Sequence, residues 1–251
     1  MQTVAQRFHF AAFAARIATV SALACIPTLA AAHGIWVAQR IDQPTIVYGH
    51  GSEDGAYDPA KVTQSVGLTT SGEKLAVTIT PHESNATIDI PEGAAVVATT
   101  FDNGFWIKDS TGNWQNVGKR QVPDGTEAHH PLKYNTHLAG PFEGPLAPWG
   151  AALEIVPQSN PAALAYGDEY VVQVLLNGEP LPGVALINDY INLPNGMTPA
   201  VTDDKGMITL KVTSAGLNVV GVEHSTKVTD DPDTDELFLF STLSFALPHV
   251  E

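Results

Sequence analysis

Short runs of strand-forming residues, separated by turn residues, most constrain how this chain can fold. Between residues 34 and 101 they are rich in Val, Ile, Thr and aromatic residues, as in GIWVAQ, TIVYGH, KLAVTITP, ATIDI and AAVVATTF. Gly, Pro, Asn and Asp punctuate them, and DNG at 102–104 predicts a hairpin between two of the runs. No long pattern with the 3.6-residue period of an amphipathic helix follows residue 33. The sequence therefore predicts an all-β protein.

A second series of strand-like runs follows a linker-like segment, PQSNPAALAYGD. It includes YVVQVLLNGEPLPGVALINDYI, GLNVVGVEHS and LFLFSTLSFAL, and TDDKG predicts a tight turn with Gly206 at a positive-φ position. Regular turn spacing of this kind is typical of a β-sandwich. We expect two antiparallel β-sandwich-like domains, residues 33–157 and 166–251.

The first 32 residues have the layout of a secretory signal peptide. Arg7 and Arg16 supply positive charge, residues 17–26 are apolar, and the small residues 30–32 fit a signal-peptidase site. The apolar stretch is shorter than the roughly 20 residues that a membrane-spanning helix needs. We expect cleavage after Ala32 and a periplasmic or secreted mature protein without a membrane span. An uncleaved anchor and a lipoprotein carried on Cys25 are the alternatives.

Composition narrows the chemistry that the mature chain can perform. Cys25 is the only cysteine and lies inside the signal, so His, Asp and Glu remain as metal ligands. The mature chain keeps all 27 acidic residues and ten of the 12 basic ones, a formal charge of −17. Such a charge repels nucleic acid and attracts cations.

The segment from residue 33 to 51, HGIWVAQRIDQPTIVYGHG, carries two histidines beside strand-like runs. If the signal is cut after Ala32, the α-amino group and the imidazole of His33 can close a chelate ring on a metal ion. His50 stands between Gly49 and Gly51, which lets its backbone approach another group closely. We expect His33 and His50 on neighbouring strand ends, sharing one ion. The alternatives are a strand-capping His33 and a turn histidine at His50.

Residues 118–150 are rich in Pro, Gly and His and weak in strand pattern. A loop of this length in a compact domain is usually functional or disordered, and its aromatic residues favour order. His137 lies in this segment, where it either closes over the site or is an ordinary surface histidine. The adjacent His129 and His130 point apart in an extended chain and are expected on the surface, with an accessory metal site as the alternative.

Several motifs resemble the DUF4198 family across the mature chain: HGIW, VYGHG, DNGFW, KYNTHLAGP, GLNVVGVEH and STLSFALPH. The resemblance implies a β-rich periplasmic protein whose C-terminal domain is immunoglobulin-like or transthyretin-like. Exported proteins of the family are linked to nickel and cobalt uptake systems, which implies an inner-membrane metal transporter as partner. His33, His50, His137 and His224 match the family's motif positions and are the expected metal ligands.

His224 has a structural alternative as well. Strand alternation places it on the face of Val222 and Val220, where it is either a hydrogen-bonded inward histidine or a ligand. It joins His33 only if the two expected domains pack against each other.

Three functions remain open from the sequence. The first is a periplasmic protein that binds nickel or cobalt for an inner-membrane uptake system. Copper would bind more tightly by its intrinsic affinity, and zinc also fits nitrogen and oxygen ligands. The second is a copper enzyme or carrier with a brace at His33, and the third is a metal-free envelope interaction module. GxSxG, HExxH, Walker and Rossmann patterns are missing, so we expect no enzyme unless the copper brace is one.

Overall fold

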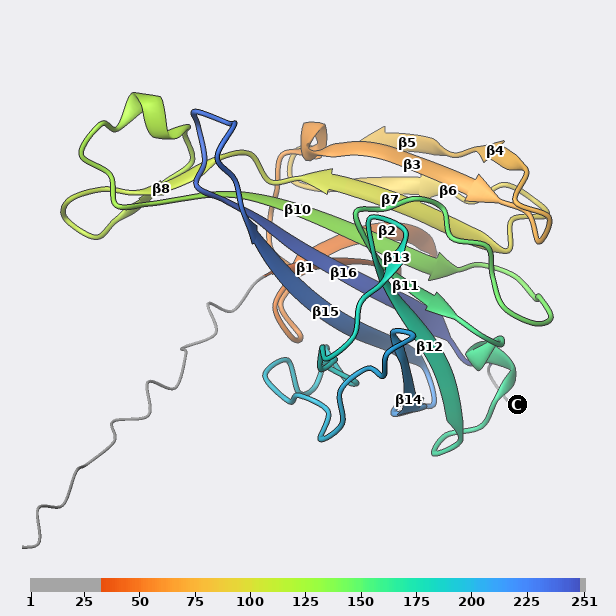
Figure 1. Ribbon diagram of the computed structural model, residues 1–251. Helices are drawn as coiled ribbons and strands as arrows, with labels where there is room; N and C mark the ends of the chain where they lie inside the picture. Colours follow the sequence, from red (N-terminus) through yellow and green to blue (C-terminus); the bar gives the residue numbers. More distant parts are fainter. Residues whose placement is uncertain (1–32, 249–251) are drawn as a thin grey trace, which may run out of the picture. The chain divides into compact units, whose positions relative to one another are not determined.

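The computed structural model describes residues 33–248, and its regular secondary structure is almost entirely β-strand (Figure 1). The expected signal peptide, its cleavage after Ala32 and the alternative lipidation of Cys25 lie outside the described residues. Within residues 33–248 the helices are short 3-10 turns, η1 (Pro59–Lys61), η2 (Lys119–Gln121) and η3 (Pro161–Ala163). None of these is long and apolar enough to cross a membrane. The all-β prediction is confirmed.

The first sheet is antiparallel and has the spatial order β1, β2, β6, β5. Its strands are β1 (Gly34–Arg40), β2 (Gln43–Gly49), β6 (Ala86–Asp89) and β5 (Thr78–Pro81). β1 and β2 form a hairpin whose two turn residues, Ile41 and Asp42, have positive φ values of 46° and 61°. A turn of that hand matches the twist of the strands it joins. Both faces of this hairpin are buried: Ile35 and Val37 pack with Phe101, and Trp36 packs with Tyr190.

The second sheet is the largest, with the order β15, β16, β10, β7, β3, β4. Its strands are β15 (Leu217–Lys227), β16 (Glu236–Ala246), β10 (Glu127–Leu138), β7 (Val96–Asp102), β3 (Val62–Leu68) and β4 (Lys74–Ala76). In addition, β8 (Trp106–Lys108) pairs with β10, and β9 (Trp114–Gln115) pairs with β8. β10 and β16 are parallel, and the other described pairs of this sheet are antiparallel.

The third sheet is antiparallel. The hairpin of β1 and β2 packs on one face of the second sheet, and the third sheet packs on the other face. It contains β11 (Leu153–Pro157), β12 (Glu169–Leu176), β13 (Glu179–Pro180) and β14 (Met207–Lys211). Alternation along β16 divides its side chains between two clusters: Leu243 and Phe245 pack with Leu153 and Ile155 of β11, whereas Phe240 packs with Tyr190. Each fully buried side chain of this size contributes about 1.5–3 kcal/mol. The second sheet is therefore held from both sides.

The strand β10 corrects the expectation of a long loop over residues 118–150. Residues 127–138 pair with β16, β7 and β8. Their strand pattern is hidden because polar residues occupy covered positions: Asn135 is 1% exposed and donates to the hydroxyls of Thr242 (2.9 Å) and Ser244 (3.1 Å). Satisfied hydrogen bonds make this burial tolerable, but they leave no apolar alternation to recognise.

The prediction of a hairpin at residues 102–104 is wrong. β7 and β8 do not pair with each other but follow one another along β10, with Leu132–Leu138 beside β7 and Glu127–His129 beside β8. The backbone N–H of Asn103 donates to the carbonyl of Pro131 (3.0 Å), so the chain stays alongside β10 through the turn residues. Gly104 has a φ of 72°. The chain bends here without reversing its direction, as it would in a hairpin.

The pairing of β10 with β16 links the two parts of the chain that the sequence suggests as domains. His129 to His137 run in register with Glu236 to Ser244. Strands from both sides of residues 158–165 thus share one sheet. The division into residues 33–157 and 166–251 stays a prediction.

Candidate metal site at the adjoining ends of β1 and β2

His33 and His50 lie side by side at the open end of the β1–β2 hairpin. His33 directly precedes β1, His50 directly follows β2, and Gly34 faces Gly49 in the register. The centroids of the two imidazole rings are 6.4 Å apart, with the ring planes tilted by 56°. Two residues that are 17 positions apart in sequence are therefore neighbours because one hairpin joins them.

Tyr190 ties the two strand ends together. Its hydroxyl accepts a hydrogen bond from the N–H of Gly34 (2.8 Å) and donates one to the carbonyl of Gly49 (3.0 Å). Its ring meets the His50 ring edge-on at 5.8 Å. Tyr190 is fully buried, and burial raises the pKa of its hydroxyl above the usual range, which keeps the proton that it donates.

Lys133 approaches His33 from β10. Its side chain is 2% exposed, and its ammonium group donates to the carbonyl of His33 and lies 5.7 Å from the centroid of the Tyr48 ring. Burial, with a smaller contribution from the charge of Lys61, lowers the pKa of Lys133 to about 7. A cation next to a metal site would repel the ion, and a lowered pKa reduces that charge.

The imidazole of His33 lies between Tyr48 and Glu53. It stacks on the Tyr48 ring with centroids 5.0 Å apart, and its Nε2 is 3.4 Å from Oε2 of Glu53. Burial and the charge of Lys133 lower the pKa of His33, while Glu53 acts in the opposite direction. The net direction favours the neutral imidazole, which is the form that binds metals.

His50 is held in a turn that only glycines on both sides permit. A Cβ on Gly49 would lie 2.2 Å from the carbonyl oxygen of Glu53, and Gly51 has a φ of 66° and would contact Pro194 at 3.0 Å. Nδ1 of His50 is buried and has no hydrogen-bond partner among the described residues. A buried nitrogen without a partner is costly in free energy unless something else binds it.

The other two expected ligands lie elsewhere. His137 is on β10 and points to the same side of the sheet as Lys133, but four residues further on, about 13 Å along the strand. Its Nδ1 is 3.0 Å from the hydroxyl of Ser244. His224 pairs with Leu239 and shares the face of Val220, as alternation predicts, and that face is turned toward the third sheet rather than toward His33.

His129 and His130, the adjacent pair on β10, each contact an acidic residue. Nε2 of His130 lies 2.8 Å from Asp102, and Nε2 of His129 lies 3.5 Å from Glu236. Among residues 33–248 no group of three or more His, Cys, Asp or Glu side chains is placed to hold a metal ion. A metal at His33 and His50 would thus need a further ligand that is not one of these side chains.

The three acidic residues that follow His50 in the sequence each contact a different partner. Asp54 forms an ion pair with Arg40 (3.0 Å), and Asp58 caps the helix η1 through the N–H of Ala60 (2.9 Å). Of these three acidic residues, Glu53 is the one that contacts His33. Sequence reasoning missed Tyr190 and Lys133, because neither stands near a histidine of the pair in the sequence.

Comparisons with known proteins place the chain in a family without assigning a function. The sequence model described as "Domain of unknown function (DUF4198)" matches residues 30–226, a span that contains His33, His50, His137 and His224. A protein of Haemophilus influenzae described as "Uncharacterized protein" is 25% identical over 220 residues, which cover 87% of this chain and 92% of the relative. No solved structure matches the chain.

Proposed function

The chain belongs to the DUF4198 family, and we propose that it binds one divalent transition-metal ion through His33 and His50 in the periplasm. The observation that carries this proposal is the pair of imidazoles with ring centroids 6.4 Å apart, one of which has a buried nitrogen without a partner. Metal–imidazole bonds of about 2.0–2.1 Å, with roughly 1.1 Å from each ring nitrogen to its centroid, put the centroids of two rings on one ion at most about 6.4 Å apart, when the two nitrogens lie on opposite sides of the ion. The two ligating nitrogens would therefore lie on nearly opposite sides of the ion.

The third ligand is the α-amino group that cleavage after Ala32 would create on His33. Glu53 contacts Nε2 of His33, and a carboxylate on one ring nitrogen typically orients a histidine whose other nitrogen binds the metal. Nδ1 of His33 can then close a chelate ring with its own amino group. This ligand set leaves room between the two imidazoles for the amine.

We propose nickel or cobalt as the ion and delivery to an inner-membrane transporter as the purpose. Imidazole and amine nitrogens suit both metals, and the mature chain that starts at His33 contains no cysteine and so no thiolate ligand. Copper binds such nitrogen ligands more strongly in general, so availability or geometry would have to select nickel or cobalt. The formal charge of −15 for the whole chain favours the approach of cations.

A copper-binding enzyme or carrier is the second candidate. It is favoured by the contact of Glu53 with Nε2, because this contact leaves Nδ1 of His33 to pair with the amine in a brace. A protein that binds no metal would instead support the third function, an envelope interaction module.

Competition calorimetry with Ni²⁺, Co²⁺, Cu²⁺ and Zn²⁺ on protein that begins at His33 tests the proposal. We expect one ion per chain, with the strength of binding reduced when His50 is replaced. A matched control is His224→Ala, because His224 faces the third sheet. Absence of binding for all four ions would overturn the proposed function.

A further inference from the structure

A hollow of about 410 Å³ lies on the face of the second sheet opposite to Lys133 and His33. Its walls include Gln64, Lys74, Thr100, Tyr134 and Trp149. The volume falls within the range of about 300–1,000 Å³ that is typical of small-molecule sites. Tyr134 follows Lys133 on β10, so the two side chains point to opposite faces and the hollow is separate from the candidate metal site.

The floor of the hollow is one row of side chains across three strands. Gln64 on β3 pairs with Thr100 on β7, and Thr100 pairs with Tyr134 on β10. Residues directly opposite each other in antiparallel strands have their side chains on the same face. An amide, a hydroxyl and an aromatic ring are therefore presented together by rigid backbone.

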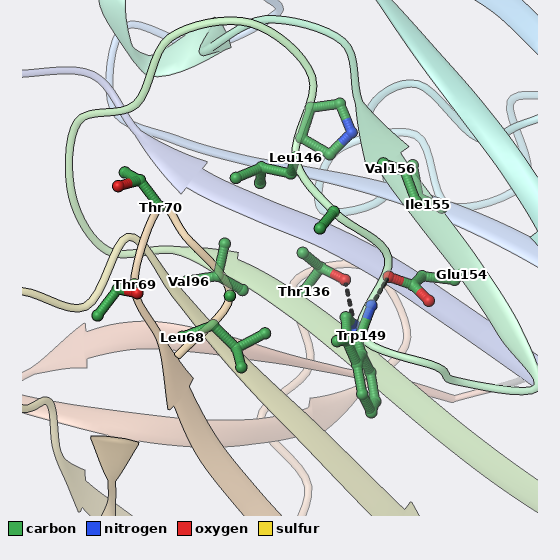
Figure 2. Close-up of a pocket in the computed structure, with 13 residues that line it drawn as sticks. Leu68, Thr69, Thr70, Val96, Thr136, Leu146, Trp149, Glu154, Ile155 and Val156 are labelled. Atoms are coloured by element: carbon green, nitrogen blue, oxygen red, sulfur yellow. Dashed lines mark hydrogen bonds between the residues drawn. The ribbon is translucent and has the colours of Figure 1, made fainter. Parts of the chain in front are cut away.

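Trp149 also lines the hollow, and hydrogen bonds to Thr136 and Glu154 hold it in place (Figure 2). Its indole Nε1 donates to the hydroxyl of Thr136 (3.0 Å), and its backbone N–H donates to Oε1 of Glu154 (2.8 Å). Its ring meets that of Tyr134 at 6.1 Å with an angle of 63°. A tryptophan held at both its backbone and its ring nitrogen offers apolar contact area at little cost in conformational entropy.

Glu154 explains how the chain around Trp149 is held. Glu154 is 2% exposed, and its Oε2 accepts a hydrogen bond from the N–H of Gly150 (3.1 Å). Burial raises the pKa of Glu154, whereas the backbone hydrogen bonds act in the opposite direction. Charge-assisted bonds of this type are stronger than neutral ones, so they anchor the turn that carries Trp149.

A second cavity shares Leu68 and Trp149 with the hollow but is much smaller. Its volume is about 20 Å³, which is enough for a water molecule and for nothing larger. Leu146 and Ile155 close it on the side toward the third sheet (Figure 2). Of these two spaces, only the larger hollow has room for a ligand.

Three polar side chains of the hollow are free to bind a ligand. The side chains of Gln64, Lys74 and Thr100 make no hydrogen bond or ion pair with other described residues. Together they offer donors from an ammonium and both donors and acceptors from an amide and a hydroxyl. Sugar hydroxyls both donate and accept, and the apolar face of a sugar ring can cover an indole.

We propose that this hollow binds one sugar residue of a glycan, with the ring on Trp149 and the hydroxyls toward Gln64, Thr100 and Lys74. The acidic chain, with a formal charge of −15, disfavours phosphorylated ligands, whereas a neutral sugar meets no such repulsion. This binding is independent of the metal proposed at His33.

The test is a calorimetric titration of the protein that begins at His33 with chitotetraose, cellotetraose and maltotetraose. We expect binding of at least one of these probes, and a loss of tenfold or more in affinity for Trp149→Ala. Trp114→Ala is the matched control, because Trp114 is 42% exposed on β9 and lies outside the hollow. Binding should be the same with and without Ni²⁺.

Gln64→Ala is a second test variant, for the case that Trp149→Ala does not fold. Gln64 is an exposed residue of β3, so its replacement should leave the fold intact. It should weaken the same probe at least threefold while the circular dichroism spectrum stays that of the wild type. Absence of binding for all three probes would overturn the proposal. Equal losses in Trp149→Ala and Trp114→Ala, or an unchanged affinity in Gln64→Ala, would overturn it too.

Discussion

His33 and His50 stand at adjoining strand ends with their ring centroids 6.4 Å apart. The seven register pairs of the β1–β2 hairpin fix this separation, and Tyr190 adds a hydroxyl that bridges the two ends. Backbone pairing and the Tyr190 hydroxyl thus place the two imidazoles beside each other. A preorganised pair binds more tightly than one that must first be ordered.

Replacing His50 by alanine should weaken metal binding while leaving the fold intact. We expect a loss of at least about 10–100-fold, which is the effect known even for residues that merely orient a ligand. Calorimetry with Ni²⁺ measures it, and His137→Ala is a second control because His137 lies about 13 Å further along β10 than Lys133. Equal affinities for His50→Ala and wild type would remove His50 from the site.

Replacing Tyr190 by phenylalanine should destabilise the protein by about 1–3 kcal/mol. The substitution leaves the N–H of Gly34 and the carbonyl of Gly49 without the hydroxyl that they contact. Urea denaturation measures the change in the free energy of unfolding. Tyr170→Phe is the matched control: its hydroxyl is buried without a partner among the described residues, so its removal should be neutral or stabilising. Equal effects of the two substitutions would contradict the bridging role of Tyr190.

The strands and the neighbourhood of His33 and His50 follow from local pattern, because one short turn joins two strand-like runs. The face of His224 also follows from alternation, but the sequence does not say which layer covers that face. β10 escapes recognition because Asn135 and Lys133 are buried polar residues within it. Tyr190 contacts Gly49 from 141 residues away, and no local pattern predicts such a contact.

Replacing Gly49 by alanine should disrupt the turn that carries His50. The new Cβ would lie 2.2 Å from the carbonyl oxygen of Glu53, a backbone atom that cannot move aside like a flexible side chain. We expect a loss of about 1–3 kcal/mol in the free energy of unfolding, as for other overpacked positions. Gly216→Ala is the control, because its nearest neighbour would be 3.9 Å away. A Gly49→Ala protein as stable as Gly216→Ala would contradict the tight turn.

The half-buried His137 should make stability fall as the pH drops from 6.5 to about 4. Burial lowers the pKa of His137 to about 4 in the folded protein from an ordinary value of 6.5, so in this window the unfolded chain binds the proton and the folded chain does not. The expected loss is on the order of 1–3 kcal/mol.

Urea denaturation of wild type and His137→Gln between pH 7 and pH 4.5 isolates this contribution from those of the carboxyl groups. The variant should lose less stability than the wild type over that range. The exposed His82→Gln provides the control. A constant difference between wild type and His137→Gln at every pH would show that His137 is not the cause.

The central claim is that the amino group of His33 and the imidazoles of His33 and His50 bind one ion, and a single comparison tests it most directly. Ni²⁺ affinity is measured for protein that begins at His33 and for protein that retains Ala32 before it. The extra residue turns the amine into an amide, which no longer offers the same ligand, but it leaves both imidazoles in place. We predict one ion per chain for the first protein and binding at least tenfold weaker for the second. Equal affinity of the two proteins would contradict the claim.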